Sequence, residues 1–259
     1  MATALVTGGT AGIGNAFCRH LAARGHDLVI VARDVERMNT LATELHQAYG
    51  AEVEVFPADL SVAEDVTRVA ERLEDASRPI EVLVNNAGFG LHAKLLDKSE
   101  LGLQRRAMDV MCWAVLELSA AAGRAMKARG HGTIINVAST SAWIMSGNYS
   151  AVKAWCLSFT QGLAGELHGS GVKVSALCPG WVHTEFHDRA GISAGNLPDI
   201  VWVDVDTLVQ QALDDAEAGR IISIPTLKWK IAIQIAQHAP RWTMRSASRL
   251  LSSSRQKKK

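Results

Sequence analysis

Tyr149 and Lys153 stand four positions apart in a segment, residues 149–168, whose pattern predicts a helix. Residues at this spacing share one face of a helix, so we expect the phenol and the ammonium to lie close together. A phenol has an ordinary pKa of about 10, and a nearby ammonium favours its ionised form. In an arbitrary protein such a pair is usually just solvated, but in a binding site it could exchange a proton with a substrate oxygen.

A glycine-rich turn, Thr7-Gly8-Gly9-Thr10-Ala11-Gly12-Ile13-Gly14, follows the first strand-like run and opens a predicted helix. Glycines permit positive φ angles and let the backbone approach a ligand closely. The N-terminus of the helix offers unpaired N–H groups to an anion. The turn therefore predicts binding of the pyrophosphate of a dinucleotide.

Strand-like runs of β-branched and leucine residues alternate with helix-period segments along the chain. Such runs are typical of strands buried on both faces, as in a parallel sheet covered by helices. We predict a single-domain α/β fold, a Rossmann-type doubly wound parallel sheet of about seven strands with helices on both faces. The predicted strands are Ala4–Thr7, Leu28–Ala32, Val53–Pro57, Val82–Asn85, Thr133–Val137, Val172–Leu177 and Arg220–Ile224, and the predicted helices lie near residues 12–24, 34–48, 61–76, 99–129, 149–168 and 204–218.

The C-terminal part of the chain differs in charge from the rest. After Glu217 there is no acidic residue, whereas ten Lys and Arg occur from Arg220 to Lys259. We expect a main domain over residues 1–225 and an amphipathic, basic extension over 226–259, of which about the last ten residues are disordered. The mixture of tryptophan, aliphatics and cations resembles an interfacial helix, and a helix that closes the substrate pocket or packs on a partner subunit is the alternative.

The composition limits the classes of protein to consider. The chain has 259 residues, 48% of them hydrophobic, and a net charge of +1. A strand begins almost at Met1, which leaves no room for a cleaved leader, and no apolar run reaches the roughly 18–20 residues of a membrane span. We expect a cytoplasmic protein, with peripheral membrane contact through the basic extension. No nucleic-acid motif accompanies the basic charge.

Cysteines and histidines give no sign of a metal or a disulfide. Cys18, Cys112, Cys156 and Cys178 are scattered and form no CxxC pair, so we expect buried free thiols. His183 and His187 are four apart, but no third ligand accompanies them, and we expect no metal.

The turn reads TGxxxGIG rather than GxGxxG, and in this it resembles the short-chain dehydrogenase/reductase family, notably 3-oxoacyl reductases and hydroxysteroid dehydrogenases. Further family motifs follow in order to about Pro225. They are Asp59-Leu60, Asn85-Asn86-Ala87-Gly88, the YxxxK pair and Pro179-Gly180-Trp181-Val182-His183-Thr184. The resemblance implies direct hydride transfer between a nicotinamide and a carbon, without a metal, to interconvert a ketone and a secondary alcohol.

Site residues follow from the resemblance position by position. It implies that Ser139, Tyr149 and Lys153 are catalytic: Ser139 would hydrogen-bond the substrate oxygen, and Lys153 would also bind the nicotinamide ribose. Only ten positions separate Ser139 from Tyr149, so Ser141 is the alternative serine. The implied cofactor contacts are Gly8, Thr10, Gly12, Ile13, Gly14, Arg33, Asp59, Leu60, Asn85, Ala87, Gly88, Tyr149, Lys153, Pro179, Gly180, Val182 and Thr184.

The end of the second strand bears on the choice of cofactor. NAD enzymes usually place a carboxylate there for the ribose diol, but this chain has Ala32 followed by Arg33. A guanidinium suits a 2′-phosphate, and Arg37 lies about one turn later. We expect NADP(H), with NAD(H) as the alternative if Asp34 contacts the ribose instead.

Aromatic residues dominate the implied substrate pocket, Phe89, Trp143, Trp181 and Phe186. They favour a small lipophilic carbonyl or alcohol, such as a 3-oxoacyl chain or a steroid-like ring, over a sugar. In the family, the segment after Thr184 is a mobile lid. Relatives are commonly dimers or tetramers, so we expect a homo-oligomer.

One position departs from the family pattern. Many relatives carry an asparagine in the fourth major helix that holds a water of the proton relay, and the best match here is Met111. A thioether cannot replace an amide as donor and acceptor, and Asp109 is expected to face elsewhere. The alternative function is therefore a catalytically weak nucleotide-binding scaffold or a membrane-associated regulatory protein of the same fold.

Overall fold

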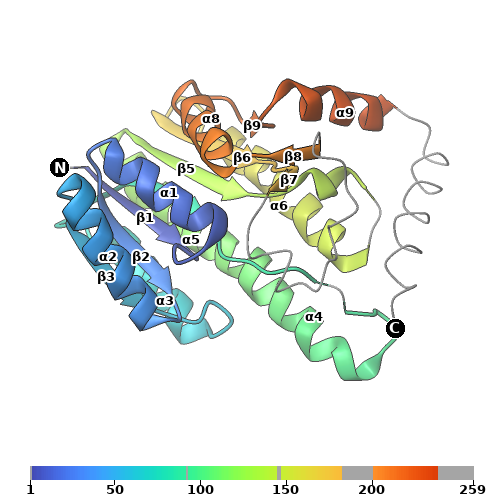
Figure 1. Ribbon diagram of the computed structural model, residues 1–259, viewed down its shortest axis with the longest axis horizontal. Coiled ribbons are helices and arrows are strands. Elements are labelled where there is room, and N and C mark those ends of the chain that lie inside the picture. Colours follow the sequence, from blue (N-terminus) through green and yellow to red (C-terminus); the bar gives the residue numbers. More distant parts are fainter. Residues whose placement is uncertain (1, 92, 145–146, 183–200, 239–259) are drawn as a thin grey trace.

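Seven parallel strands form one sheet in the order β3-β2-β1-β4-β5-β6-β9 (Figure 1). The computed structural model describes residues 2–91, 93–144, 147–182 and 201–238. The predicted fold class is confirmed, and two predicted strands have the bounds observed. The strands are β1 (Thr3–Thr7), β2 (Asp27–Ala32), β3 (Val53–Pro57), β4 (Ile80–Asn85), β5 (Gly132–Val137), β6 (Val172–Leu177) and β9 (Ile222–Ser223).

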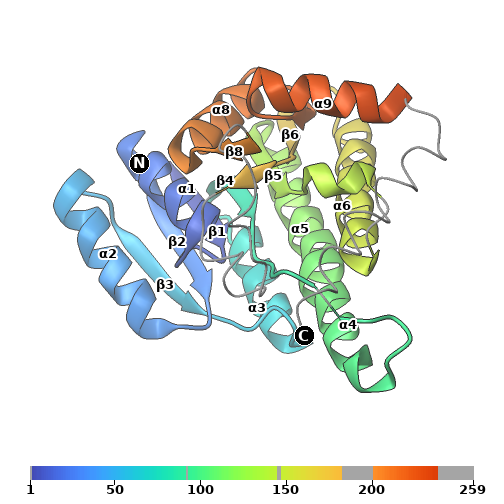
Figure 2. The same cartoon turned by 45° about the vertical axis from the view of Figure 1, so that its right-hand side comes forward.

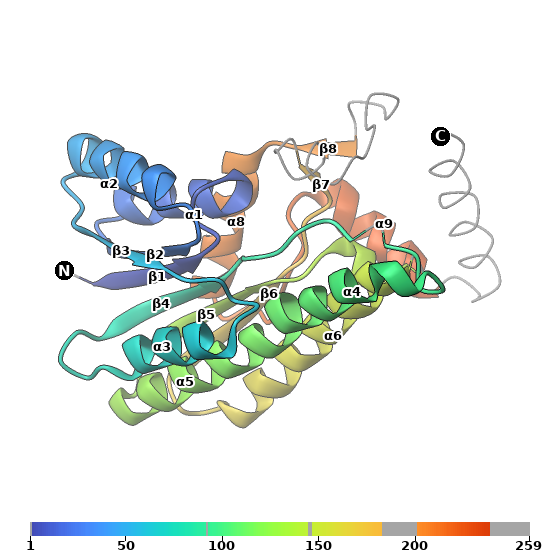
Figure 3. The same cartoon turned by 90° about the horizontal axis from the view of Figure 1, so that it is seen from below.

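Helices cover both faces of the sheet, as Figure 3 shows from below. The helices α1 (Gly12–Ala23), α2 (Val35–Tyr49) and α8 (Val205–Glu217) pack on one face, and α3 (Ala63–Glu74), α5 (Ala114–Arg129) and α6 (Gly147–Glu166) pack on the other. Strand residues such as Leu5 and Val29 are fully buried and contribute to the core beneath α3 and α5, whereas Val6 and Ile30 contribute to the core beneath α1. This alternation explains why the strands read as continuous apolar runs.

The helix predicted near 99–129 is interrupted. A short 3₁₀ turn (Lys98–Glu100) leads into α4 (Leu101–Met108), and the chain then forms a π-helical turn, Asp109–Trp113, before α5 begins. A π turn adds one residue to the helical repeat, and it therefore changes which side chains face the core. Periodicity read along the sequence did not reveal this turn.

The two short strands β7 (Trp181–Val182) and β8 (Trp202–Val203), which pair in parallel, were not predicted. The C-terminal helix α9 (Leu227–His238) follows β9, in the segment expected to form an amphipathic helix. A two-residue ladder is too short to give a periodic signal. Within the ranges that the structure describes, no helix is both long and apolar enough to cross a membrane.

The strand order reverses between β1 and β4. From β1 the chain winds outward to β3, returns to β4 beside β1 and then winds the other way. Ligands of doubly wound sheets bind at the carboxyl ends of the strands at such a switch point. The glycine turn and the segment Asn85-Asn86-Ala87-Gly88 both begin there.

A buried hydrogen-bond network fastens β4 and β5 to the helices below. The Asn85 amide donates to Asn136 Oδ1 (2.9 Å) and Ser119 Oγ (3.0 Å), Ser119 Oγ also donates to Asn136 Oδ1 (3.2 Å), and the Asn136 amide donates to Thr160 Oγ1 (3.1 Å). Asn136, Ser119 and Thr160 are fully buried. Polar groups at this depth stabilise a fold only when all are paired.

We predict that Asn136→Ala lowers the free energy of unfolding by about 2–4 kcal/mol, because it leaves Asn85, Ser119 and Thr160 short of partners in the core. Urea denaturation followed by circular dichroism measures the loss. Asn39→Ala, at an exposed position of α2, is the matched control and should change the free energy little. Equal stability of the two variants would contradict a stabilising role for the network.

Candidate active site

The glycine turn forms a cradle that side chains would fill. Gly8 and Gly12 have φ angles of 67° and 53°, which side-chain-bearing residues rarely adopt. A Cβ on Gly14 would lie 2.2 Å from the carbonyl oxygen of Gly8. The N-cap of α1 is Ala11, and no side chain caps this helix, so its first N–H groups remain available. Such a turn fits a pyrophosphate, and Thr10 and Ile13 lie within it.

Asn86 holds this turn against β4. Its amide nitrogen donates to the carbonyl oxygens of Thr7 (3.0 Å) and Gly8 (3.2 Å), while the backbone N–H groups of Asn86 and Ala87 donate to Thr7 Oγ1 (3.0 Å each). Sequence reasoning did not single out Asn86. Successive strand residues point to opposite faces, so of the two asparagines only one can join the core network, which is Asn85.

At the end of β3, Asp59 lies between two arginines. Arg106 Nη2 of α4 donates to Asp59 Oδ2 (3.0 Å), and Arg33 Nη1 lies 3.8 Å from the same oxygen. Burial opposes ionisation of Asp59, but hydrogen bonds from Ser61 and the charges of Arg106 and Arg33 outweigh it, so the pKa lies below its usual value. Leu60 beside it is buried in the core. No motif in the sequence pointed to Arg106.

Arg33 faces solvent at the end of β2, with 66% of its side chain exposed. Asp34 is used differently: its carboxylate caps α2 by accepting from the Arg37 N–H (3.0 Å), and its second oxygen lies 3.6 Å from Arg37 Nε. A carboxylate engaged in capping is less suited to bind a ribose diol. The geometry therefore favours Arg33 as the group that meets the adenosine end of a nucleotide.

The three residues expected to carry the chemistry come together at the carboxyl end of β5. Ser139 accepts a hydrogen bond from the Ser141 N–H (3.0 Å) at the start of the short helix Thr140–Trp143, and its side chain is hydrogen-bonded with Tyr149. Lys153 Nζ lies 5.9 Å from the centroid of the Tyr149 ring. Of the two candidate serines, Ser139 is the one that meets the phenol.

Burial dominates the electrostatics of this cluster. It raises the pKa of Tyr149 above its ordinary value, and the hydrogen bond with Ser139 offsets part of that rise. Burial likewise lowers the pKa of Lys153, whose ammonium donates to the carbonyl oxygen of Val137 (2.8 Å). The spacing of the pair had predicted that the ammonium favours the phenolate. In the structure the ammonium is directed to the backbone, and burial favours the protonated phenol.

Met111 lies in the π turn at the back of this site. It is 2% exposed, and its Sδ is the atom closest to where a Cβ on Gly88 would stand (3.1 Å). Its thioether thus packs against the turn after β4 and offers no strong polar group. Asp109 pairs with Arg105 (2.8 Å) on the exposed side of the helix.

The segment after β6 is covered by the C-terminal helix. The Trp229 indole lies on Gly180, where a Cβ would stand 2.1 Å from its Cε2, and its Nε1 donates to the Val201 oxygen (3.1 Å). Lys228 Nζ donates to the Trp202 oxygen (2.5 Å). Helix α9 therefore fastens both β8 and the Pro179-Gly180 segment. Sequence reasoning missed Trp229, because nothing in an amphipathic pattern says which aromatic turns inward.

The other residues expected at the substrate pocket and the cofactor are partly or fully buried, or lie outside the described residues. Phe89 and Trp143 are partly buried against the core, Trp181 meets Trp202 edge to face (5.9 Å), and Val182 is buried. Thr184, Phe186, His183 and His187 lie outside the described residues. The parts of the chain that the structure describes contain no group of three or more His, Cys, Asp or Glu side chains suited to a metal ion.

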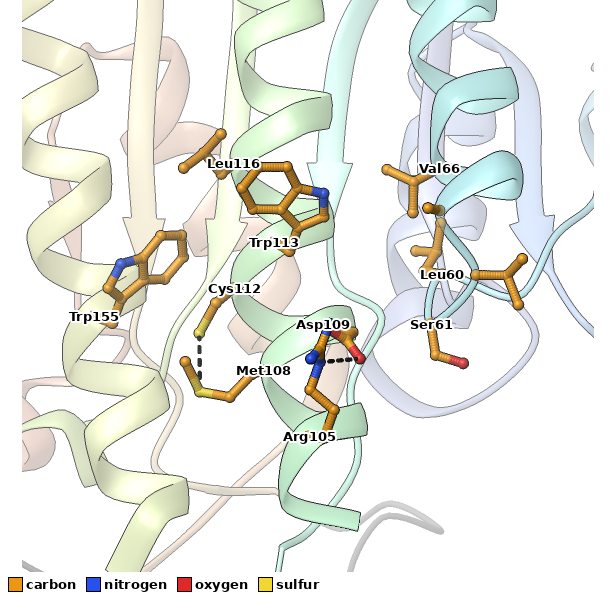
Figure 4. A pocket seen from close by; sticks show the side chains of 12 residues that line it. Leu60, Ser61, Val66, Arg105, Met108, Asp109, Cys112, Trp113, Leu116 and Trp155 are labelled. Carbon is orange, nitrogen blue, oxygen red and sulfur yellow. Dashed lines mark hydrogen bonds and ion pairs between the residues drawn. The ribbon is translucent and has the colours of Figure 1, made fainter. Parts of the chain in front are cut away.

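A separate apolar groove of about 610 Å³ lies between α3, α5 and α6 (Figure 4). In Figure 4, Met108, Trp113 and Leu116 lie in the middle. Trp155 of α6 lies on one side of them, and Leu60 and Val66 lie on the other. It contains none of Ser139, Tyr149 and Lys153. The groove is thus a surface feature distinct from the active-site cluster.

Comparisons with known proteins agree on one family. The model of the short chain dehydrogenase family matches residues 2–192. The chain is 40% identical to galactitol 2-dehydrogenase (L-tagatose-forming) of Cereibacter sphaeroides over 192 residues, 71% of this chain and 72% of that enzyme. A short-chain dehydrogenase from Sphingobium yanoikuyae in complex with NADPH has a TM-score of 0.80 and 33% identity, and the match covers 98% of this chain and 95% of that one. The bulky-bulky ketone specific alcohol dehydrogenase from Comamonas testosteroni has a TM-score of 0.76 and 30% identity, with 100% and 96% covered.

We predict that Gly180→Ala lowers the free energy of unfolding by about 1–3 kcal/mol, because the new methyl group must displace the Trp229 indole. The same substitution in a Trp229→Ala background should cost much less, since the obstructing ring is gone. Thermal and urea unfolding of the four proteins complete a double-mutant cycle. Additive effects of the two substitutions would show that Gly180 and Trp229 are not in contact.

Proposed function

The chain belongs to the short-chain dehydrogenase family, and we propose that it interconverts a ketone and a secondary alcohol on a lipophilic substrate, with Tyr149 as general acid and base. The observation that carries this proposal is the meeting of Ser139 and Tyr149 at the end of β5. The glycine turn after β1 opens on the same edge of the parallel sheet. A hydroxyl and a phenol so placed can hold and protonate one substrate oxygen.

The cofactor is NADP(H), for two independent reasons. Arg33 is exposed at the strand end where NAD enzymes usually have a carboxylate, and Asp59, which lies 3.8 Å from it, already accepts a hydrogen bond from Arg106. A guanidinium in that position suits a 2′-phosphate. In addition, the short-chain dehydrogenase from Sphingobium yanoikuyae, similar over nearly the whole chain, was solved with NADPH.

A nicotinamide held beside Tyr149 and Lys153 would supply the hydride for reduction of the carbonyl carbon. Tyr149 gives its phenolic proton to the carbonyl oxygen, and Ser139 donates a hydrogen bond to the same oxygen. Burial raises the pKa of Tyr149 and so favours the protonated phenol, which is the form that reduction requires. We assign the Lys153 ammonium, one helical turn later, to the nicotinamide ribose.

The aromatic residues beside the site support a bulky apolar substrate. Phe89, Trp143 and Trp181 are each only partly buried and come from three different segments, and we assign them to the substrate pocket. The similar enzyme from Comamonas testosteroni is specific for bulky-bulky ketones, whereas the enzyme from Cereibacter sphaeroides acts on galactitol. We favour a 3-oxoacyl chain or a steroid-like ring, and a substrate panel should include a polyol as the competing class.

A second candidate function rests on Met111. Its buried thioether stands where many relatives have the asparagine of the proton relay, so a nucleotide-binding scaffold with little turnover is the competing proposal. Tight NADPH binding with no turnover of any carbonyl in the panel would favour it.

We also propose a cytoplasmic homo-oligomer. The four cysteines are all free thiols, which suits a reducing compartment. The groove of Figure 4 exposes Trp113 and Met108, and a copy related by a twofold axis would present the same apolar side chains. Light scattering of Trp113→Glu against the wild type tests this assembly: an unchanged mass would exclude the groove as the interface.

We predict that Tyr149→Phe lowers kcat/KM for ketone reduction by about 10²–10⁴-fold and changes the Kd of NADPH by no more than about twofold, because it removes only the proton donor. NADPH oxidation across 3-oxoacyl esters, steroids, aromatic ketones and a ketose measures the first quantity, and nucleotide fluorescence the second. The chain has one other tyrosine, Tyr49, which is exposed at the end of α2. Tyr49→Phe should behave as wild type, and full activity of Tyr149→Phe would refute the assignment.

We predict that Arg33→Ala raises the Kd of NADPH by about 10–100-fold and leaves the Kd of NADH nearly unchanged, since it removes charge-assisted hydrogen bonds to the 2′-phosphate alone. Calorimetric titration with both nucleotides measures the two constants. Arg124→Ala, at an exposed position on α5, is the control. If both nucleotides lose affinity equally, Arg33 does not read the 2′-phosphate.

A further inference from the structure

The outer face of α9 carries a line of exposed aliphatic side chains. Leu227, Ile231 and Ile235 are 72%, 51% and 66% exposed, and their spacing of four residues places them along one side of the helix. Figure 2 shows α9 at the rim of the molecule. We call these three residues the α9 ridge. Three neighbouring aliphatics in water are costly, so the ridge calls for an explanation.

The opposite face of α9 is already occupied. Ile233 is 4% exposed, Trp229 packs on Gly180, and Lys228 and Trp229 donate to the backbone oxygens of residues 202 and 201. The helix also begins from a defined geometry: Thr226 has a φ of 72°, and its N–H donates to Gln211 Oε1 (3.2 Å). The helix therefore cannot rotate to bury the ridge without breaking these contacts.

The amino-acid sequence of this part of the chain carries charge of one sign. Lys228 and Lys230 lie within α9, and from Ala218 to Lys259 the chain has ten Lys and Arg and no acidic residue. The other 17 of the 27 basic residues lie before this segment, together with all 26 acidic residues. An apolar line bordered by cations is complementary to a surface that is apolar beneath and anionic above.

We propose that α9 docks on an anionic lipid surface, with the ridge at the acyl boundary and the basic residues at the headgroups. A second copy of the chain is a poorer occupant, because a specific protein interface uses roughly 20–30 residues a side and the ridge has three. A bilayer needs no matching shape and draws on the basic segment as a whole.

Docking would place the lipid beside the helix that covers the Pro179-Gly180 segment. The inner face of the same helix contacts Gly180 and β8. A membrane would then supply the lipophilic substrate directly. The supply of substrate from the membrane rests on the proposed substrate class, whereas the docking of α9 does not.

Flotation of the full-length protein with vesicles tests the docking. The probes are vesicles of phosphatidylcholine alone and of phosphatidylcholine with one third phosphatidylglycerol. The test variant is Leu227→Ser/Ile231→Ser/Ile235→Ser, and the matched control is Gln234→Ser/Gln237→Ser, at exposed polar positions of the same helix. NADPH binding and circular dichroism, which none of these residues should affect, establish that each variant is folded.

We expect the wild type and the control to float with the anionic vesicles, and the ridge variant to partition at least about 10-fold less. The wild type should bind the neutral vesicles more weakly. Reduction of a ketone should proceed in the ridge variant as in the wild type when the substrate is soluble, so failure of the proposed activity and failure of docking are separable.

Three results would overturn the proposal. If the wild type does not float, α9 binds no lipid surface. If the ridge variant floats as well as the wild type, the basic charge binds alone and the ridge is not involved. If the ridge variant has a smaller mass than the wild type by light scattering without vesicles, a second copy covers the ridge instead.

Discussion

The hydrogen bonds between Thr7 and Asn86 join the ends of two strands that are far apart in sequence. One hydroxyl accepts two backbone N–H groups from the turn after β4, and one amide donates to two carbonyl oxygens of the turn after β1. These bonds hold the turn after β1 against the turn after β4, at the point where the strand order reverses. The glycine cradle takes its position from them, and the crevice of a doubly wound sheet lies at this point.

Burial determines the chemistry available at the end of β5. A solvated tyrosine–lysine pair would have close to ordinary pKa values, whereas here burial moves the pKa of Tyr149 up and the pKa of Lys153 down. Neither charge is favoured, and the ammonium is satisfied by the backbone at Val137. Tyr149 is thereby held as a neutral phenol next to Ser139, at the same carboxyl end of the sheet where Asn85 and Asn136 make their buried hydrogen bonds.

The sequence predicted best the strands that are covered by helices on both faces. The strands Val53–Pro57 and Val172–Leu177 have the predicted bounds, because their residue pattern reflects the helices that cover them. The family motifs likewise led to Ser139 and Tyr149, which lie together in the structure, and the end of the predicted second strand led to Arg33. The π turn at Asp109–Trp113, the β7–β8 ladder and the contact of Trp229 with Gly180 could not be predicted. Each depends on how segments that are distant in the sequence pack together, and none produces a periodic pattern of hydrophobic residues. The role of Arg106 was not predicted for the same reason, because its partner Asp59 is distant in the sequence.

Helix α9 lies beyond the part of the chain that matches the family model, residues 2–192, yet it covers the Pro179-Gly180 segment. Trp229 occupies the space above Gly180 that any other residue at position 180 would need for its side chain. A larger residue at position 180 therefore requires a smaller one at position 229. An exchange of the C-terminal helix would reshape the surface over Gly180, whereas the glycine turn and the Ser139–Tyr149 pair lie on other elements.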